Sequence, residues 1–360
     1  EHVRTSSERP LLVFLKYPKA ETQSALNEKV ANNSHASPMK KDRIGVAIVG
    51  AGGFAKGMHL PNIQKLHDLY ELRAIVSRTG LNADSTAKQF GAQYGTTDFN
   101  QALVDKTIDV VIIATRHHLH AEMALAALKA GKHVLLEKPM ALSESEIEKI
   151  EQFFKEVGPN APQLLTGFNR RFSRHIQEAK KALQGRSNPI IVNYRMNAGY
   201  IPLDHWVHGK EGGGRNLGEA CHIYDLFAYL TASSPIAVTA MSINPKTNAY
   251  SARDNFVATI AYEDGSVANL TYTALGAKAY PKEQMEIFFD GKVITMDDFK
   301  ATRVSGTKFP SYESKIPEKG QLEELKAFAD CLKSGDWAIP LMEQIETTRL
   351  ALAVDRQLSE

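Results

Sequence analysis

From residue 44 onward, short apolar runs alternate with stretches whose apolar residues recur at helical spacing. Four runs predict strands that are buried on both faces, at residues 44–49, 72–76, 109–114 and 133–136. Helical spacing follows at residues 81–90 and 120–130, and a third helix is predicted after Ser143, with Glu146 in the capping-box position. This alternation predicts a parallel, doubly wound sheet with helices on both faces, an α/β fold.

After about residue 162 the pattern changes to apolar runs separated by short polar turns. The strand-like runs lie at residues 190–195, 256–262, 267–272 and 285–289, with hairpin turns at 263–266 and 290–292. We expect a second, α+β region with an open, mostly antiparallel sheet. Two amphipathic helices are predicted at the end of the chain, at residues 322–332 and 342–358.

The first forty-one residues have a different texture. Residues 10–18 hold a short apolar run bounded by prolines, which predicts one strand, and residues 19–41 have the polar composition of a linker. A lone strand is not stable by itself. It either joins a sheet of this chain or closes a domain that lies upstream.

Length and composition limit the class of protein. With 360 residues the chain is long enough for about two domains. We place the boundaries at 1–41, 42–161 and 162–360. A net charge of +2, without blocks of like charge, gives no support for a nucleic-acid or membrane partner. Two cysteines fit a reducing compartment, and we expect a cytoplasmic protein.

A glycine-rich loop follows the first strand directly. Residues 50–55 read Gly-Ala-Gly-Gly-Phe-Ala and match G-x-G-x-x-G/A. Gly50 permits the tight turn, while Gly52 and Gly53 let the backbone approach a pyrophosphate. Phe54 and Ala55 begin the helix, whose first amides face the anion. In this strand–loop–helix context the motif predicts dinucleotide binding.

The end of the second strand bears on the choice between NAD and NADP. An NAD site usually has an Asp or Glu about 20 residues after the first glycine, where it binds the ribose hydroxyls. Here the strand ends in Ser77, Arg78 and Thr79. A guanidinium and two hydroxyls suit a 2′-phosphate, so NADP is favoured over NAD.

The strand at residues 133–136 runs into Glu137, Lys138 and Pro139. Ligands of open α/β sheets bind at the carboxyl ends of the strands, so we expect Glu137 and Lys138 to face the cofactor crevice. Pro139 is a candidate for a cis peptide bond.

These motifs together resemble the glucose–fructose oxidoreductase / inositol dehydrogenase / rhizopine catabolism (Gfo/Idh/MocA) family. The resemblance covers residues 43–360. It is carried by residues 50–55, 114–122, 130–139 and 212–225. It implies a Rossmann domain, then a substrate-binding and oligomerisation domain, with NAD(P)-dependent oxidation or reduction of a secondary alcohol on a sugar, cyclitol or sugar nucleotide.

The resemblance also implies roles for single residues. Lys138 matches the lysine that contacts the reacting hydroxyl, and His222 matches the proton-accepting histidine, whose ordinary pKa suits a base near neutral pH. The family has Asp four residues before that histidine, where this chain has Gly218. We take Glu219, on the same helical face, as its replacement. His205 and Trp206 belong to the same substrate-binding region by resemblance.

The loop after the strand at 109–114 contains three histidines. By resemblance it flanks the nicotinamide through Thr115, His117 and His120, with His117 at the position of a customary Asn. His-x-His spacing also occurs in zinc sites, but no patterned Cys or acidic partner lies nearby, so we predict no metal. Asn169 and Arg170 open the second domain, where Arg170 or Arg171 is a candidate ligand for a substrate carboxylate or phosphate.

Four further expectations complete the prediction from the sequence. Alternative functions are reduction of a non-sugar acceptor, such as an imine or tetrapyrrole, and non-catalytic NADP-dependent regulation. The predicted partners are a small sugar-like substrate and further copies of the chain, as a dimer or tetramer. We expect apolar residues such as Phe256, Val257, Ile260, Tyr272, Ile287 and Phe289 to cover both faces of the antiparallel sheet. The segment at residues 11–16 resembles the closing strand of a medium-chain alcohol dehydrogenase domain, which predicts a bidomain fusion.

Overall fold

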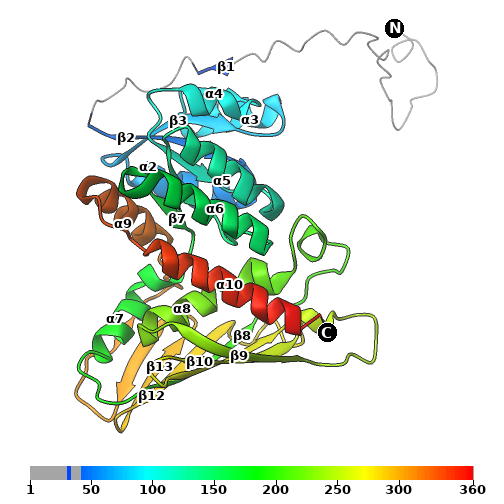
Figure 1. Ribbon diagram of the computed structural model, residues 1–360, viewed down its shortest axis with the longest axis vertical. Helices are drawn as coiled ribbons and strands as arrows, with labels where there is room; N and C mark the ends of the chain where they lie inside the picture. Colours follow the sequence, from blue (N-terminus) through cyan, green and yellow to red (C-terminus); the bar gives the residue numbers. More distant parts are fainter. Residues whose placement is uncertain (1–30, 34–41, 360) are drawn as a thin grey trace, which may run out of the picture.

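The computed structural model describes residues 31–33 and 42–359, and these form two layered regions, one above the other in Figure 1. Within the described residues the first sheet has seven strands. Their order is β1 (Ala31–Asn32), β4 (Tyr94–Thr96), β3 (Tyr70–Val76), β2 (Ile44–Val49), β5 (Val110–Ile113), β6 (His133–Leu136) and β7 (Leu164–Thr166). β2 to β7 are parallel to one another, and β1 is antiparallel to β4. The predicted doubly wound sheet is confirmed.

Helices cover this sheet. They are η1 (a π-helical turn, Ala55–His59), α2 (Leu60–Lys65), α3 (Gly80–Phe90), α4 (Phe99–Val104), η2 (His117–Leu119), α5 (His120–Lys129) and α6 (Glu144–Val157). The capping box predicted at Ser143 and Glu146 is present, with both reciprocal hydrogen bonds. β3 is buried along its whole length, as its continuous apolar run predicts.

The second sheet has eight strands among the described residues. Their order is β15 (Tyr312–Glu313), β14 (Ala301–Ser305), β13 (Lys292–Asp297), β12 (Glu283–Phe289), β8 (Ile191–Asn197), β11 (Val267–Thr273), β10 (Phe256–Tyr262) and β9 (Pro235–Ser242). β8 and β11 are parallel, and the other neighbours are antiparallel. The expected mostly antiparallel sheet is confirmed.

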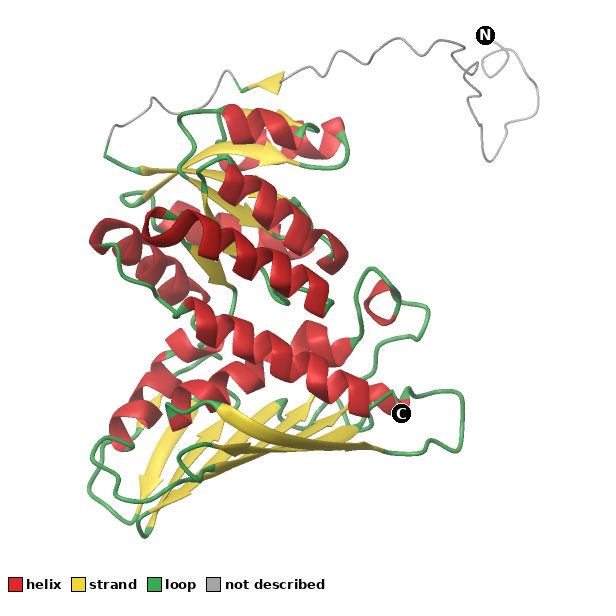
Figure 2. Cartoon of the chain, in the orientation of Figure 1, coloured by secondary structure: helices red, strands yellow, loops and turns green. Residues whose placement is uncertain are grey.

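Figure 2 shows the helices of this second region gathered on one face of the sheet, between it and the first region. They are η4 (Asn169–Phe172), α7 (Arg174–Ala182), η5 (Trp206–His208), η6 (a π-helical turn, Asn216–Ala220), α8 (Cys221–Thr231), α9 (Gln321–Ser334) and α10 (Leu341–Gln357), with short turns η3 (Gly158–Asn160) and η7 (Ala252–Asp254) elsewhere. α10 packs on α8 and β9 and also touches α6 and β7, while α9 packs on α2 and η4. The two C-terminal helices thereby tie the two regions together.

Two sequence expectations fall at the start of the chain. The strand predicted at residues 10–18 lies outside the described residues. Structure was not expected over 19–41, yet Ala31 and Asn32 pair with β4, and Asn33 is buried with its Nδ2 donating to the carbonyl oxygens of Ala87 and Ala92. The edge of β4 supplies unpaired backbone groups there, which local composition does not reveal.

Among the helices of the described segments, none combines the length and apolarity needed to cross a bilayer.

Candidate active site

A cleft of about 680 Å³ lies at the carboxyl ends of β2, β3, β5 and β6. This is the edge at which open parallel sheets bind their ligands. Of the predicted cofactor residues, the lining includes Gly50, Gly52, Gly53, Phe54, Ser77, Arg78, Thr115, His117, His120, Glu137 and Lys138. Ala55 and Thr79 are not part of the lining. Ala55 is fully buried against the strand, and Thr79 caps the N-terminus of α3.

The glycine loop has the geometry that a dinucleotide requires. Gly50 has a φ of 94°, and a Cβ there would lie 2.5 Å from the carbonyl oxygen of Ala114. Residue 50 must therefore be glycine for the loop to pass β5. Gly52 and Gly53 have open space on their Cα atoms, so a bulky anion can approach their backbone. The residues present fit a dinucleotide.

The loop after β3 is held by an asparagine that the sequence reading missed. Nδ2 of Asn82 donates to Oγ of Ser77 over 2.7 Å and to the carbonyl oxygen of Ala51 over 2.9 Å, and Asn82 also lines the cleft. Asn82 thus joins the glycine loop to the end of β3. Arg78 is exposed at the cleft wall, and among the described residues it has no hydrogen bond or ion pair.

The histidine loop packs against the second region. His117 Nδ1 lies 2.7 Å from the carbonyl oxygen of Gly212, and its ring meets Trp206 edge-on with 4.9 Å between centroids. The guanidinium of Arg116 stacks on the same indole at 4.0 Å. Trp206, predicted as a substrate residue, therefore lines the cofactor cleft.

His120 has a different environment from His117. It is fully buried, with Nδ1 2.7 Å from the carbonyl oxygen of Pro139 and Nε2 3.3 Å from that of Thr115. It links the loop after β5 to the loop after β6. Burial, followed by the charge of Lys138, lowers the pKa of His117 to about 3, and burial also lowers the pKa of His120. Both imidazoles are neutral at physiological pH.

Lys138 lies where β6 ends, at the boundary between the two regions. Its Nζ donates to the carbonyl oxygen of Gly218 over 2.6 Å. The peptide bond to Pro139 is cis, as the sequence suggested. Oε1 of Glu137 lies 2.8 Å from Nε2 of His59. Burial raises the pKa of Glu137, but this contact and the charge of Lys138 lower it by more, so the net shift is downward. The acid next to Lys138 is therefore ionised.

His222 is 5% exposed, and its Nδ1 has no hydrogen-bond partner in the described part of the chain. Burial lowers the pKa of His222 well below 6.5, and the charges of Arg170 and Lys138 lower it further. The sequence reading assumed a base with an ordinary histidine pKa. The structure instead places a neutral imidazole among cations, so it accepts a hydrogen bond but resists full protonation.

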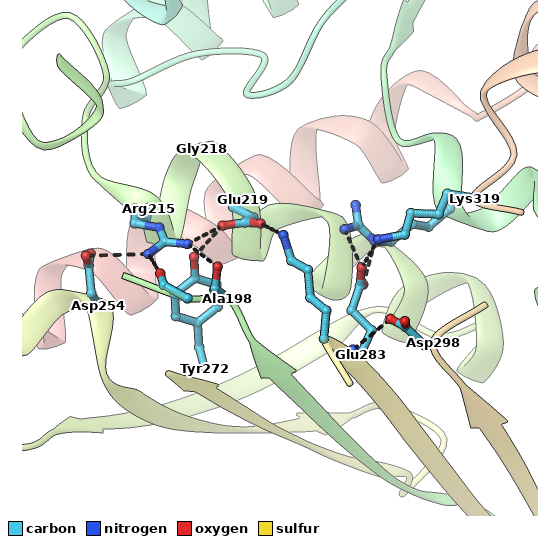
Figure 3. A network of polar contacts seen from close by, with 12 residues as sticks. Ala198, Arg215, Gly218, Glu219, Asp254, Tyr272, Glu283, Asp298 and Lys319 are labelled. Carbon is cyan, nitrogen blue, oxygen red and sulfur yellow. Dashed lines mark hydrogen bonds and ion pairs between the residues drawn. The ribbon is translucent and has the colours of Figure 1, made fainter. Parts of the chain in front are cut away.

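Glu219 does not contact His222 in the way its spacing suggested. Its carboxylate accepts from Lys282 at 2.7 Å, Arg215 at 2.9 Å and Tyr272 at 2.6 Å (Figure 3). Within the described residues, no hydrogen bond or ion pair joins it to His222. Residues 216–220 form a π-helical turn, which removes the i, i+3 alignment of an α-helix. We therefore revise its assignment as the partner of His222.

The remaining predicted substrate residues lie apart from the cleft lining. Arg170 is 5% exposed and donates Nε and Nη2 to Glu283, at 2.9 Å and 3.1 Å. Asn169 donates to the carbonyl oxygen of Lys319, and Arg171 bonds Asp225. His205 is exposed and caps η5. Arg170 and Arg171 are thus paired inside the protein, and the expectation of a free arginine for the substrate is revised.

Sequence reasoning also missed the lysines of this region. Lys282 and Lys319 bond Glu219 and Glu283 respectively, and both lower the pKa of His222 after burial, Arg170 and Lys138. Lys282 precedes a predicted strand and Lys319 precedes a predicted helix. No local pattern distinguishes either from a solvated lysine.

Gly218 fits closely against His117, and this predicts a cost for any side chain there. A Cβ at residue 218 would lie 2.8 Å from Cε1 of His117, whose ring is fixed by Gly212 and Trp206. We expect Gly218→Ala to lower the free energy of unfolding by about 1–3 kcal/mol. Urea denaturation measures this.

The matched background for that substitution is His117→Ala. Removing the ring removes the clash, so Gly218→Ala should cost much less there than in the wild-type protein. An equal cost in both backgrounds would show that the imidazole is not what excludes a side chain at residue 218.

Comparison with known proteins agrees with this geometry. Residues 44–160 match the oxidoreductase family with an NAD-binding Rossmann fold, and residues 177–295 match the GFO/IDH/MocA C-terminal domain. The chain belongs to this family of oxidoreductases, as its motifs indicated.

Similar proteins include several named dehydrogenases. Myo-inositol 2-dehydrogenase of Thermotoga maritima is 24% identical over 306 residues, which are 81% of this chain and 89% of that protein. The 4-carboxy-2-hydroxymuconate-6-semialdehyde dehydrogenase of Sphingobium sp. is 35% identical over 198 residues, 51% of this chain and 58% of that one. A levoglucosan dehydrogenase, solved with NADH and levoglucosan, superposes with a TM-score of 0.75 at 21% identity, covering 88% of this chain and 97% of that chain.

Proposed function

We propose that the protein transfers hydride between a nicotinamide cofactor and a secondary alcohol or ketone of a sugar, cyclitol or sugar nucleotide. The observation that carries this is a cleft that fits a dinucleotide and is lined by Lys138, whose ammonium bonds the carbonyl oxygen of Gly218, four residues before the buried His222. The named relatives that act on inositol and levoglucosan support the substrate class.

The chain's own residues have distinct parts in this reaction. The glycine loop and Asn82 hold the dinucleotide, and the loop with His117 and Trp206 closes one side of it. When bound, the cofactor accepts or gives a hydride at its nicotinamide ring. Lys138 donates a hydrogen bond to the reacting oxygen, and an unprotonated ring nitrogen of His222 accepts the hydroxyl proton as the hydride leaves, then releases it to water because its pKa is low. The surrounding cations stabilise the oxygen as negative charge develops on it.

The direct test is a screen of sugars, cyclitols and sugar nucleotides with each cofactor, following the absorbance of the reduced nicotinamide. We expect at least one compound to be oxidised. Binding of NAD(P) without oxidation of any compound in the panel would refute the proposal.

We further propose a preference for NADP over NAD, supported by Arg78 and by the absence of a carboxylate among the described residues that line the cleft at the end of β3. Arg78→Gln should weaken NADP binding about tenfold or more, because a charge-assisted bond to the 2′-phosphate is lost, and should leave NAD binding nearly unchanged. Fluorescence titration with each cofactor measures both. Equal effects on NAD and NADP would contradict the role of Arg78.

A homo-oligomer is also proposed, through the outer face of the second sheet, which the helices leave uncovered in Figure 2. Of the apolar residues expected on both faces, only Val257 is exposed, at 50%; Phe256, Ile260, Tyr272, Ile287 and Phe289 are buried. Exposed apolar residues are paired at two places on the outer face, Ile191 with Phe288 across β8 and β12, and Val257 with Met241 across β10 and β9.

Light scattering should show a dimer or tetramer that Ile191→Asp dissociates, because an unpaired carboxylate is costly in an apolar interface. Leu81→Asp is the matched control, since Leu81 is 83% exposed on α3 of the other region. A wild-type monomer would contradict the proposal.

A cytoplasmic location is proposed on the cysteines. Cys221 is buried and Cys331 half-buried, and both are free. Free cysteines are typical of reducing compartments.

A further inference from the structure

Two carboxylates in the second region, one buried and one half-buried, are each shared by two cations. Glu283 accepts from Arg170 through two hydrogen bonds and from Lys319 at 2.5 Å. Glu219 accepts from Arg215 and from Lys282. Figure 3 shows the two groups side by side above the sheet, Arg215, Glu219 and Tyr272 in one and Glu283, Lys319 and Asp298 in the other.

The cations outnumber the carboxylates that pair with them. Arg215 also lies 3.8 Å from Asp254, so Glu283, Glu219 and Asp254 serve four cations. Lys138 is a fifth cation, and within the described residues its hydrogen bond goes to a carbonyl oxygen, not to a carboxylate. Its neighbour Glu137 is a fourth acid, engaged by His59. Beside Arg170, Arg171 is shared by two further acids, Asp225 and Glu343, so the charges of the wider cluster balance.

His222 lies near four of these cations. Its main charged neighbours are all cations, namely Arg170, Lys138, Lys319 and Lys282, and after burial they are what lowers its pKa. Its Nδ1 is buried without a partner in the described chain. A buried polar atom without a partner is costly unless a ligand satisfies it.

Two of these cations can reach a ligand. The side chain of Lys282 is 40% exposed and that of Lys319 is 24% exposed, whereas Arg170 is 6% exposed. Lys282 bonds Glu219 and Lys319 bonds Glu283, the carboxylates of the two groups that lie side by side in Figure 3, so both ammonium groups belong to the same part of the site. An ammonium has three donors, and each of these two lysines uses one of them on its carboxylate, so both keep donors for an anionic ligand.

We propose that the substrate carries a fixed negative charge, a carboxylate or a phosphoryl group, which Lys282 and Lys319 bind while its reacting hydroxyl lies at Lys138. This inference rests on the proposed function and narrows its substrate class to acidic or phosphorylated sugars. Each ammonium contributes a charge-assisted hydrogen bond, which a neutral sugar cannot replace.

The test compares matched pairs on wild-type protein saturated with NAD or NADP. Isothermal titration is run with D-glucose, D-glucuronate and D-glucose 6-phosphate, with D-galactose and D-galacturonate, and with UDP-glucose and UDP-glucuronate. We expect at least one member with the additional negative charge to bind about tenfold or more tightly than the partner that lacks it. The advantage should shrink as NaCl is raised. Tighter binding of a uronate would identify the bound group as a carboxylate, and tighter binding of D-glucose 6-phosphate would identify it as a phosphoryl group. No advantage in any pair would overturn the inference.

Lys282→Gln and Lys319→Gln should each remove most of that advantage and leave cofactor binding unchanged. Lys278→Gln and Lys326→Gln are matched controls that remove the same charge from exposed positions nearby, and they should keep the advantage. Because each lysine also bonds a carboxylate, folding is checked by circular dichroism, and the wild-type comparison stands even where a variant does not fold. Equal loss in variants and controls would refute the assignment of the two lysines.

Turnover on the same pairs separates this inference from the proposed function. Oxidation of neutral sugars with no gain for acids refutes the inference and keeps the function. Tight binding of acids without oxidation of any sugar refutes the function and keeps the anion site.

Discussion

Replacing Lys138 with alanine should lower kcat by about 10²- to 10⁴-fold, the range expected when a group that manages the reacting proton is lost. Its ammonium lies at the carboxyl end of β6, fixed by the carbonyl oxygen of Gly218, and it lines the cofactor cleft. Without it, the reacting oxygen loses its nearest donor while negative charge builds on it. Steady-state kinetics with the best compound from the screen measures the loss, and fluorescence titration should show that cofactor affinity changes little.

Lys132 provides a matched control at the other end of the same strand. Lys132 is buried where Lys138 is half-buried, and its Nζ donates to the carbonyl oxygens of Asp105 and Ile108, away from the cleft. Lys132→Ala should therefore lower the free energy of unfolding and leave kcat of the folded protein near the wild-type value. If Lys138→Ala kept a wild-type kcat, Lys138 would have no part in the chemistry.

The cofactor half of the site could be predicted because its parts are local in sequence. A strand, a glycine turn and a helix that follow each other define the loop at Gly50, and the end of β6 defines Lys138. The physical constraints there act between residues a few positions apart, such as the tight turn at Gly50 or the capping box at Ser143. Such constraints leave a readable pattern in a single chain.

The substrate half could not be predicted in the same way, because its contacts join distant residues. Lys138 meets Gly218 across 80 positions, and Arg170 meets Glu283 across 113. The π-helical turn at residues 216–220 also has no clear signal, and it redirects Glu219 toward Lys282. Family resemblance located His222 but gave no indication of the cations around it, so its charge state had to come from the fold.

His222→Asn should lower kcat by about 10²- to 10³-fold, because the variant lacks the buried ring nitrogen that we propose as the acceptor for the reacting hydroxyl. His175→Asn is the matched control: it replaces a fully buried histidine of the same region whose ring nitrogens bond Thr302 and Ser314. Its kcat should stay near the wild-type value. A similar loss of kcat in both variants would point to a general packing defect rather than to chemistry at His222.

The pH dependence follows from the same burial. Since burial and the neighbouring cations hold the pKa of His222 well below 6.5, the folded protein keeps it neutral from that pH upward. The kcat/KM of the wild type should therefore not fall near pH 6.5 through protonation of His222, and in that range its pH profile should have the same shape as that of His222→Asn.

The free energy of unfolding, in contrast, should depend on pH through His222. Below pH 6.5 the unfolded chain takes up a proton at residue 222 and the folded chain does not, so the free energy of unfolding falls by about 1.4 kcal/mol per pH unit for this group. Urea denaturation at descending pH should therefore give a shallower fall for His222→Asn than for the wild type; identical slopes would mean that His222 titrates normally in the folded protein.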